Sequence, residues 1–208
     1  MQHNQNPLQK PPKAPVGADG VILEEEQIQD RIHSLAAALQ SELADRDVTA
    51  IVVMTGALFF AADLIRHIRR NHHCVLRTLQ LRTVWANSYE GTESGTLQFN
   101  PIGLEHNHVK DRHILIIDDI FDSGQTLHGI QNHIETMGPA GITTVVLLRK
   151  LGRQMTEYPV KIEEHHIGFD IEDHFVIGYG LDWNEMYREL PCICRFDPDE
   201  QGELADGS

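Results

Sequence analysis

Hydrophobic and polar positions divide the chain into short aliphatic runs and longer stretches in which apolar residues recur every three or four positions. Runs typical of buried strands cover residues 50–54, about 74–85, 114–117, 141–148, 167–169 and 175–180. Helical spacing covers residues 28–43, 58–68 and 127–137. Continuous apolar strands that alternate with helices are typical of a doubly wound parallel sheet. We therefore expect an α/β protein that binds its ligand beyond the carboxyl ends of the strands.

The stretch from His113 to Leu127, HILIIDDIFDSGQTL, has the most distinctive chemistry. Two carboxylates, Asp118 and Asp119, follow its apolar run, and residues 122–126 offer small side chains and a glycine where the next helix is expected to begin. Backbone N–H groups at a helix start can cradle a phosphate, and carboxylates can accept hydrogen bonds from sugar hydroxyls. The stretch therefore predicts a ligand with both groups, such as ribose 5-phosphate.

Other interpretations of the local pattern stay open. A strand followed by acids and a glycine turn is common in α/β proteins. The stretch is neither a Walker A loop nor a dinucleotide fingerprint, because no Gly-Lys-Ser/Thr follows and Gly124 is its one glycine. The acidic pair of a receiver domain would open the fold, whereas Asp118 and Asp119 lie in mid-chain.

Composition limits the classes of function. The 208 residues are 41% hydrophobic and 23% charged, which suits one globular domain with tails. A net charge of −14 argues against a nucleic-acid surface. An anionic ligand must therefore be held by amides, a metal ion and a few basic side chains. No apolar run is long enough for a membrane span, and the N-terminus is polar rather than signal-like.

Cysteine, histidine and tail composition add three expectations. The cysteines, Cys74, Cys192 and Cys194, are odd in number without zinc-like spacing, which predicts a reduced cytoplasmic protein. The histidine pairs 72–73 and 165–166 are adjacent rather than at helical ligand spacing, so no zinc site is expected. Residues 1–20 are expected to form a disordered tail, 21–196 the domain and 197–208 a flexible acidic tail.

Residues 87–96, NSYEGTESGT, are polar and lie between two strand-like runs. Their composition favours an ordinary hairpin loop. A mobile lid is the functional alternative, since lids come from weakly packed loops.

Four strings together resemble one enzyme family. The stretch from His113 to Leu127 resembles the phosphoribosyl pyrophosphate (PRPP) signature of type I phosphoribosyltransferases. The string GFDIEDHFVIGYGLDWNEMYRELP, residues 168–191, looks like the C-terminal hood of bacterial hypoxanthine-guanine phosphoribosyltransferases. MTGALFFAADLIR and NSYEGTESG stand upstream in that family's order, and the match spans about residues 22–196. The resemblance implies a type I phosphoribosyltransferase fold, with a central, mostly parallel sheet flanked by helices and a small hood subdomain.

The resemblance also implies an activity. Family members serve purine salvage by transferring the 5-phosphoribosyl group of PRPP, with Mg²⁺, to hypoxanthine or guanine, which gives IMP or GMP and pyrophosphate. They are usually homodimers or homotetramers. A regulator that binds PRPP or a nucleotide without turnover is the alternative. Such a regulator needs a basic face or an added DNA-binding domain, and neither is visible in this acidic chain.

The family's functional residues can be carried over position by position. Those at the sugar and phosphates are Asp118 and Asp119 for the ribose hydroxyls and Mg²⁺, Ser123, Gly124, Gln125 and Thr126 for the 5-phosphate, Thr55, Gly56 and Arg188 for pyrophosphate, and Asp182 for Mg²⁺. Those at the base and the reacting centre are Asp122 as general acid/base on purine N7, Lys150 on the 6-oxo group, Phe175 stacked on the base, Val176 reading its edge, and Ser88 and Tyr89 in the lid.

Several of these residues have a rival structural interpretation. Asp122 could merely cap the following helix, a role that aspartate fills well. Lys150 could be a solvated lysine at a strand end, Phe175 a core residue and Arg188 a surface ion-pair residue. If Lys150 faces the base, it donates but cannot accept a hydrogen bond, which predicts hypoxanthine and guanine over adenine.

Two positions depart from the family pattern. Thr55 stands before Gly56 where the family usually has lysine or arginine, which predicts weaker PRPP binding rather than abolished turnover. Gln125 replaces the commoner lysine or apolar residue and is expected to point away from the phosphate.

Overall fold

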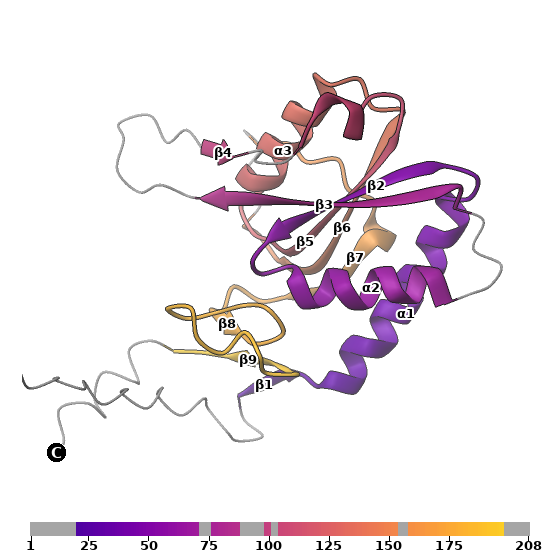
Figure 1. Cartoon of the computed structure of the whole chain (residues 1–208). Coiled ribbons are helices and arrows are strands. Elements are labelled where there is room, and N and C mark those ends of the chain that lie inside the picture. Colours follow the sequence, from indigo (N-terminus) through magenta and orange to yellow (C-terminus); the bar gives the residue numbers. More distant parts are fainter. Residues whose placement is uncertain (1–19, 71–75, 88–97, 101–103, 154–157, 198–208) are drawn as a thin grey trace, which may run out of the picture.

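The structure is a computed structural model that describes residues 20–70, 76–87, 98–100, 104–153 and 158–197. The two tails expected to be disordered lie almost entirely outside these ranges. None of the helices in the described part has the length and apolarity needed to span a bilayer. The elements are β1 (Val21–Leu23), α1 (Glu25–Glu42), β2 (Asp47–Met54), α2 (Leu58–Arg70), β3 (Thr78–Asn87), β4 (Gln98–Asn100), η1 (His106–His108), β5 (His113–Phe121), α3 (Gln125–Glu135), β6 (Gly141–Lys150), η2 (Glu164–His166), β7 (Ile167–Ile171), β8 (Val176–Ile177) and β9 (Ile193–Arg195) (Figure 1).

The main sheet has the strand order β4-β3-β2-β5-β6-β7. Strands β3, β2, β5, β6 and β7 are parallel, and β4 pairs antiparallel with β3 at one edge. The carboxyl ends of the five parallel strands therefore share one edge of the sheet, where ligands bind in this class of fold. The predicted parallel α/β sheet is confirmed.

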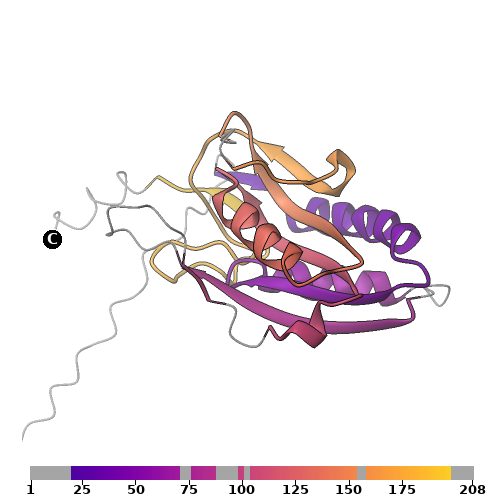
Figure 2. The same cartoon turned by 90° about the horizontal axis from the view of Figure 1, so that it is seen from above.

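The central strand β5 is buried on both faces. Its Leu115 and Ile117 pack in the cluster that contains α1 and α2, while Ile114 and Ile116 pack in the cluster that contains α3. Figure 1 and Figure 2 show these helices on opposite faces of the sheet. Because successive strand side chains point to opposite faces, a continuous apolar run is what a doubly covered strand requires.

The hood is a second, three-stranded sheet of order β1-β9-β8. The sequence predicts a C-terminal hood, but β1 from the N-terminal side pairs antiparallel with β9, so both ends of the domain build it. Tyr179 in the hood donates a hydrogen bond to Asp63 of α2 at 2.7 Å, and Gln29 of α1 donates to the Tyr179 hydroxyl at 3.3 Å. These contacts fix the hood beside the carboxyl ends of the parallel strands (Figure 1).

Several predicted strand boundaries were wrong; the run at 175–180, for example, is a strand only at Val176–Ile177. The strand predicted at 114–117 runs on to Phe121, because β6 continues to pair with β5 as far as Phe121 after the pairing with β2 has ended at Ile117. The strand predicted at about 74–85 is Thr78–Asn87. The sequence also predicts a turn and a helical segment that contain Asp182, Trp183 and Arg188. The helical part of this prediction was wrong, because the backbone turns at residues 184, 185 and 187, whose positive φ angles a right-handed helix excludes.

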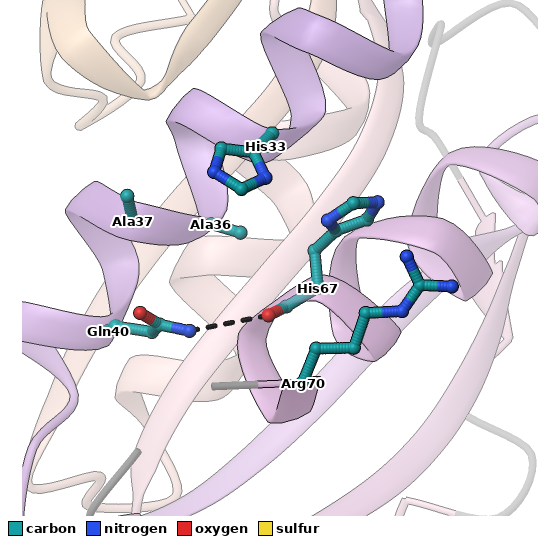
Figure 3. Close-up of a pocket in the computed structure, with 6 residues that line it drawn as sticks. All are labelled: His33, Ala36, Ala37, Gln40, His67 and Arg70. Atoms are coloured by element: carbon teal, nitrogen blue, oxygen red, sulfur yellow. Dashed lines mark hydrogen bonds between the residues drawn. The ribbon is translucent and has the colours of Figure 1, made fainter. Parts of the chain in front are cut away.

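A groove lies between α1 and α2, away from the ligand-binding edge. It encloses about 350 Å³ and is lined by His33, Ala36, Ala37, Gln40, His67 and Arg70 (Figure 3). Gln40 donates to the carbonyl oxygens of His67 and Ile68 at 3.3 and 2.9 Å. These hydrogen bonds provide partners for carbonyl groups in the last turn of α2, which have none within the helix. The two alanines leave the space open. No predicted site residue is among those that line it.

Candidate active site

The acidic pair lies near the carboxyl end of the central strand. Asp118 is 4% exposed, and the Asp119 N–H donates to its Oδ1 at 3.0 Å. Burial raises the pKa of Asp118 well above its usual range, and the neighbouring Asp119 carboxylate adds to the rise. Burial also raises the pKa of Asp119, opposed by its contact with Asp118 and by the charge of Arg188. Ionising two buried, neighbouring carboxyl groups is unfavourable unless a partner compensates their charge. A bound cation or hydroxyl groups that donate hydrogen bonds could be that partner.

The loop after β2 is pressed against this pair. A Cβ atom at Gly56 would overlap the Asp119 carboxylate, and a Cβ at Gly180 of the hood would overlap the Gly56 carbonyl oxygen. Gly180 also has φ +104°, a conformation that favours glycine. The peptide bond between Met54 and Thr55 is cis. The predicted pyrophosphate loop, the acidic pair and the hood therefore meet at one point, and only glycine fits there.

Arg188 and Asp182 lie beside that point. Arg188 Nη1 donates to the Gly180 carbonyl at 2.6 Å, and Nη2 pairs with Asp182 Oδ1 at 2.8 Å. Arg188 therefore forms an ion pair, but its partner is itself a predicted site residue, and the contact of Arg188 with pyrophosphate stays a prediction. The guanidinium contacts Gly180, whose backbone lies against the Gly56 carbonyl, and its charge acts on Asp119.

The predicted phosphate cradle forms the start of α3. The helix N-cap is Gly124, with φ +92° and no side-chain cap, so the interpretation of Asp122 as the cap is wrong. A Cβ at Gly124 would approach the Tyr158 carbonyl to 3.0 Å. A cavity of about 130 Å³ opens here, lined by Asp118, Ile120, Phe121, Asp122, Ser123, Gly124, Thr126 and Leu127. A helix N-terminus next to a small cavity suits a phosphate group.

Two carboxylates and two cationic side chains form a second cluster: Asp122, Asp173, Lys150 and Arg153. Arg153 Nε donates to Asp122 Oδ1 at 3.0 Å, and Lys150 Nζ lies 3.8 Å from Asp122 Oδ2. Lys150 and Arg153 also approach Asp173 Oδ1 at 3.4 and 3.5 Å. The Lys150 side chain is only 12% exposed, so its interpretation as a solvated lysine is wrong.

Sequence reasoning missed Asp173. It stands two residues before Phe175 in the hood string, which was the one signal available. Nothing in the sequence indicated that this carboxylate would face Lys150 from another element.

Phe175 follows Asp173 by two residues in the hood. The residue is 42% exposed, and its ring packs edge-on against Trp183, with centroids 5.3 Å apart at 89°. The interpretation of Phe175 as a core residue is therefore wrong, and the ring has a face available for a ligand. Val176 is buried, and its backbone pairs with Arg195 of β9.

Ser88 and Tyr89 lie outside the described residues, as does most of the 87–96 segment. The flanking strands are described: Asn87 of β3 pairs antiparallel with Gln98 of β4. The prediction that two strands flank the segment is confirmed, and the lid remains a prediction.

Comparison with known proteins places the chain in a family. A family model described as phosphoribosyl transferase domain matches residues 20–184. The hypoxanthine-guanine phosphoribosyltransferase of Bacillus subtilis is 36% identical over 173 residues, 83% of this chain and 90% of that protein. The hypoxanthine-guanine-xanthine phosphoribosyltransferase of Tritrichomonas foetus is 33% identical over 175 residues, 83% of this chain and 88% of that protein.

Solved structures agree with the sequence comparisons. A hypoxanthine phosphoribosyltransferase from Staphylococcus aureus superposes with a TM-score of 0.73 at 30% identity, covering 86% of this chain and 92% of that one. A hypoxanthine phosphoribosyl transferase from Trypanosoma cruzi gives a TM-score of 0.78 at 28% identity, covering 93% and 99%. The match extends over both the sheet and the hood. The chain belongs to the hypoxanthine-guanine phosphoribosyltransferase family.

Proposed function

We propose that the protein transfers the 5-phosphoribosyl group from PRPP to hypoxanthine and guanine, with release of pyrophosphate. One observation carries the proposal: the acids at the end of β5 and directly after it contact two different groups of partners. Asp119 contacts Gly56 beside Arg188, and Asp122 pairs with Lys150 and Arg153. This order supports pyrophosphate at Gly56 and Arg188, ribose at Asp118 and Asp119, and the purine at Lys150.

The acidic pair accounts for the electrostatics of the transfer. Departure of pyrophosphate leaves positive charge on the ribosyl carbon, and carboxylates held beside the sugar stabilise that charge. Asp118, Asp119 and Asp182 would hold Mg²⁺, because carboxylate oxygens are its preferred ligands and the first two are buried acids with raised pKa values. When bound, Mg²⁺ neutralises charge on the leaving pyrophosphate. Arg188 would contribute donors to the same group.

Asp122 is our candidate for the proton transfer. Attack through purine N9 requires a proton to be handled on the imidazole ring of the base, and a carboxylate within hydrogen-bond reach can accept or donate it. Asp122 stands at the end of β5 between the cradle of α3 and the side chain of Lys150. A purine attached to a ribose in the cradle would meet this carboxylate. Ser88 and Tyr89 are proposed to close over the same centre.

Lys150 and the hood set the proposed base specificity. An ammonium donates but cannot accept, so it favours a 6-oxo group and leaves the amino group of adenine unsatisfied. Phe175 would stack on the purine with its exposed ring, and the backbone of Val176 would contact its edge. The cradle proposed for the 5-phosphate consists of Ser123, Gly124, Gln125 and Thr126.

Two further proposals concern the whole molecule. We expect a homodimer or homotetramer, supported by exposed large apolar side chains on α2 and β3: Leu58, Phe59, Leu81 and Trp85. Light scattering from the full chain tests this. We also expect a cytoplasmic location, supported by Cys192 and Cys194, which are unbonded thiols with Sγ atoms 3.6 Å apart.

One assay tests the proposed reaction. The protein is mixed with PRPP, Mg²⁺ and either hypoxanthine, guanine, xanthine or adenine, and nucleotide formation is followed spectrophotometrically. We expect IMP and GMP, with little or no AMP. PRPP binding measured by calorimetry without formation of any nucleotide would instead support the regulatory alternative. Competition among the four bases in one mixture gives the order of preference.

A further inference from the structure

A histidine-carboxylate cluster lies at the opposite end of the molecule from the site described above. Glu42 is the last residue of α1, and His165 and His166 belong to η2, directly before β7. Glu42 Oε1 accepts hydrogen bonds from His165 Nε2 at 2.7 Å and from His166 Nε2 at 2.8 Å. The three possible ligand atoms lie within 4.8 Å of one another. Two imidazoles and one carboxylate thus converge on a single point.

The exposure of the three side chains suits a half-open site. His166 is 2% exposed and is therefore held rigidly, whereas Glu42 is 35% and His165 56% exposed. One side of the cluster is fixed by the core, and the other opens to solvent. Three protein ligands with an open fourth position, which water can fill, form a common arrangement around zinc.

The chemistry of the three groups is also that of a metal ligand set. Imidazole nitrogens and carboxylate oxygens are both among the groups that bind zinc in proteins. The carboxyl end of α1 also carries the negative end of the helix dipole, which favours a cation.

We propose that Glu42, His165 and His166 form a binding site for a divalent transition-metal ion of the zinc class. In a tetrahedral site with bonds of about 2.0 Å the ligand atoms lie about 3.3 Å apart, so the present contacts must widen by about half an ångström. Rotation of the His165 side chain and of the Glu42 carboxylate, both of which reach solvent, can supply that change. The sequence alone argues against zinc here, because the two histidines are adjacent rather than at helical ligand spacing. The structure adds a third ligand, Glu42, from 123 residues away from His165.

The position of the site indicates a structural role. Arg31 of α1 already ties this helix to the start of β7, by donating to the carbonyl oxygens of Ile167 and Gly168 at 2.7 and 2.8 Å. An ion bound to Glu42 and His166 would join the same two elements. It would bind the folded state and not the separated segments, and so stabilise the fold. It would take no part in the transfer reaction.

The test uses the full chain stripped of metal with a chelator. Zn²⁺ binding is measured by calorimetry and by the shift in thermal unfolding midpoint, and Co²⁺ is added to a second sample as a spectroscopic probe. The variants are His165→Ala and Glu42→Gln, with circular dichroism to verify folding. The matched control is His174→Ala, which removes an imidazole paired with Glu172 at 3.1 Å, where the described residues offer no third ligand.

We expect one Zn²⁺ per chain and a raised unfolding midpoint in the wild type and in His174→Ala. Loss of an outer partner alone weakens a metal site by about 10- to 100-fold, so His165→Ala and Glu42→Gln should weaken binding by at least about tenfold. The Co²⁺ spectrum should lack a thiolate charge-transfer band. Absence of Zn²⁺ binding in the wild type, unchanged binding in both ligand variants, equal loss in His174→Ala or a thiolate band would each overturn the proposal.

Discussion

Asp122 and Arg153, 31 residues apart in the chain, are joined by a hydrogen bond of 3.0 Å from Arg153 Nε to Asp122 Oδ1. The other carboxylate oxygen of Asp122 faces Lys150 Nζ at 3.8 Å. Both oxygens of the candidate acid/base are thus directed at cations. A purine that hydrogen-bonds Asp122 through N7 must enter between these partners. In the proposed base site, these charges are therefore already in place before a base binds.

Replacement of Asp122 tests its proposed role in proton transfer. Asparagine has nearly the same size as aspartate and keeps one acceptor oxygen, but it cannot take or give a proton. We expect Asp122→Asn to lower kcat by about 10²- to 10⁴-fold, the usual contribution of a general acid or base. The PRPP affinity, measured by calorimetry, should change little. An unchanged kcat would remove Asp122 from this role.

Replacement of Lys150 tests the recognition of the 6-oxo group. A hydrogen bond to a charged group is worth about 1.5–3 kcal/mol, so Lys150→Ala should raise the KM for hypoxanthine by about tenfold or more. Arg153→Ala is the matched control, since it removes the other cation beside Asp122. Only Lys150→Ala should reduce the preference for hypoxanthine over adenine. Equal selectivity in the two variants would contradict the assignment.

The close contact at Gly56 leads to a third prediction. A methyl group there would overlap the Asp119 carboxylate, so Gly56→Ala must displace either the loop or the acid. We expect a raised KM for PRPP in steady-state kinetics. Gly138→Ala is the control, because Gly138 also has a constrained backbone, with φ +70°, but a methyl group there would meet no described atom within 4 Å. A PRPP KM as low in Gly56→Ala as in the control would count against the loop's role.

The ligand-binding edge was predictable because its chemistry is local in sequence. The acids, the cradle and the preceding apolar run all lie between His113 and Leu127, and a buried strand followed by a helix start needs no distant information. The one local error, ending the strand at Ile117, arose because pairing with β6 holds residues 118–121 in the strand despite their acids.

The features that sequence reasoning missed all depend on contacts between distant segments. The pairing of β1 with β9 joins the two ends of the domain, and Asp173 meets Lys150 through the fold of the hood. Glu42 completes its cluster from another helix altogether. No periodicity or spacing in the sequence encodes such contacts, so they could be identified only in the three-dimensional structure.

Thr55 provides a fourth prediction, because it stands where the family usually has a basic residue. If the adjacent loop binds pyrophosphate, Thr55→Lys adds a charged donor to an anionic group. We expect the KM for PRPP to fall by up to about tenfold, the equivalent of one charged hydrogen bond. The kcat should stay within a few fold of the wild type. An unchanged or higher KM for PRPP in Thr55→Lys would mean that the side chain at position 55 makes no favourable contact with pyrophosphate.

His113 makes stability depend on pH at the opposite end of β5. Burial, assisted by the Arg46 guanidinium, lowers the pKa of His113 from 6.5 to about 4. Arg46 Nη1 lies 2.8 Å from its Nδ1, and Thr143 Oγ1 lies 2.9 Å from its Nε2. Between a pH of about 4 and 6.5 the unfolded chain binds the additional proton, so the free energy of unfolding falls as pH decreases through this window. At about 1.36 kcal/mol per pKa unit, the loss is at most about 3 kcal/mol.

His113→Gln isolates this contribution. Glutamine can keep contacts with Arg46 and Thr143 but does not titrate, so the variant should lose less stability than the wild type between a pH of about 7.5 and about 4.5. Urea unfolding at several pH values measures the difference. His166, whose pKa burial also lowers, remains in both proteins and cancels in the comparison. Unfolding free energies that decline in parallel for the two proteins would show that the pKa of His113 is the same in the folded and the unfolded chain.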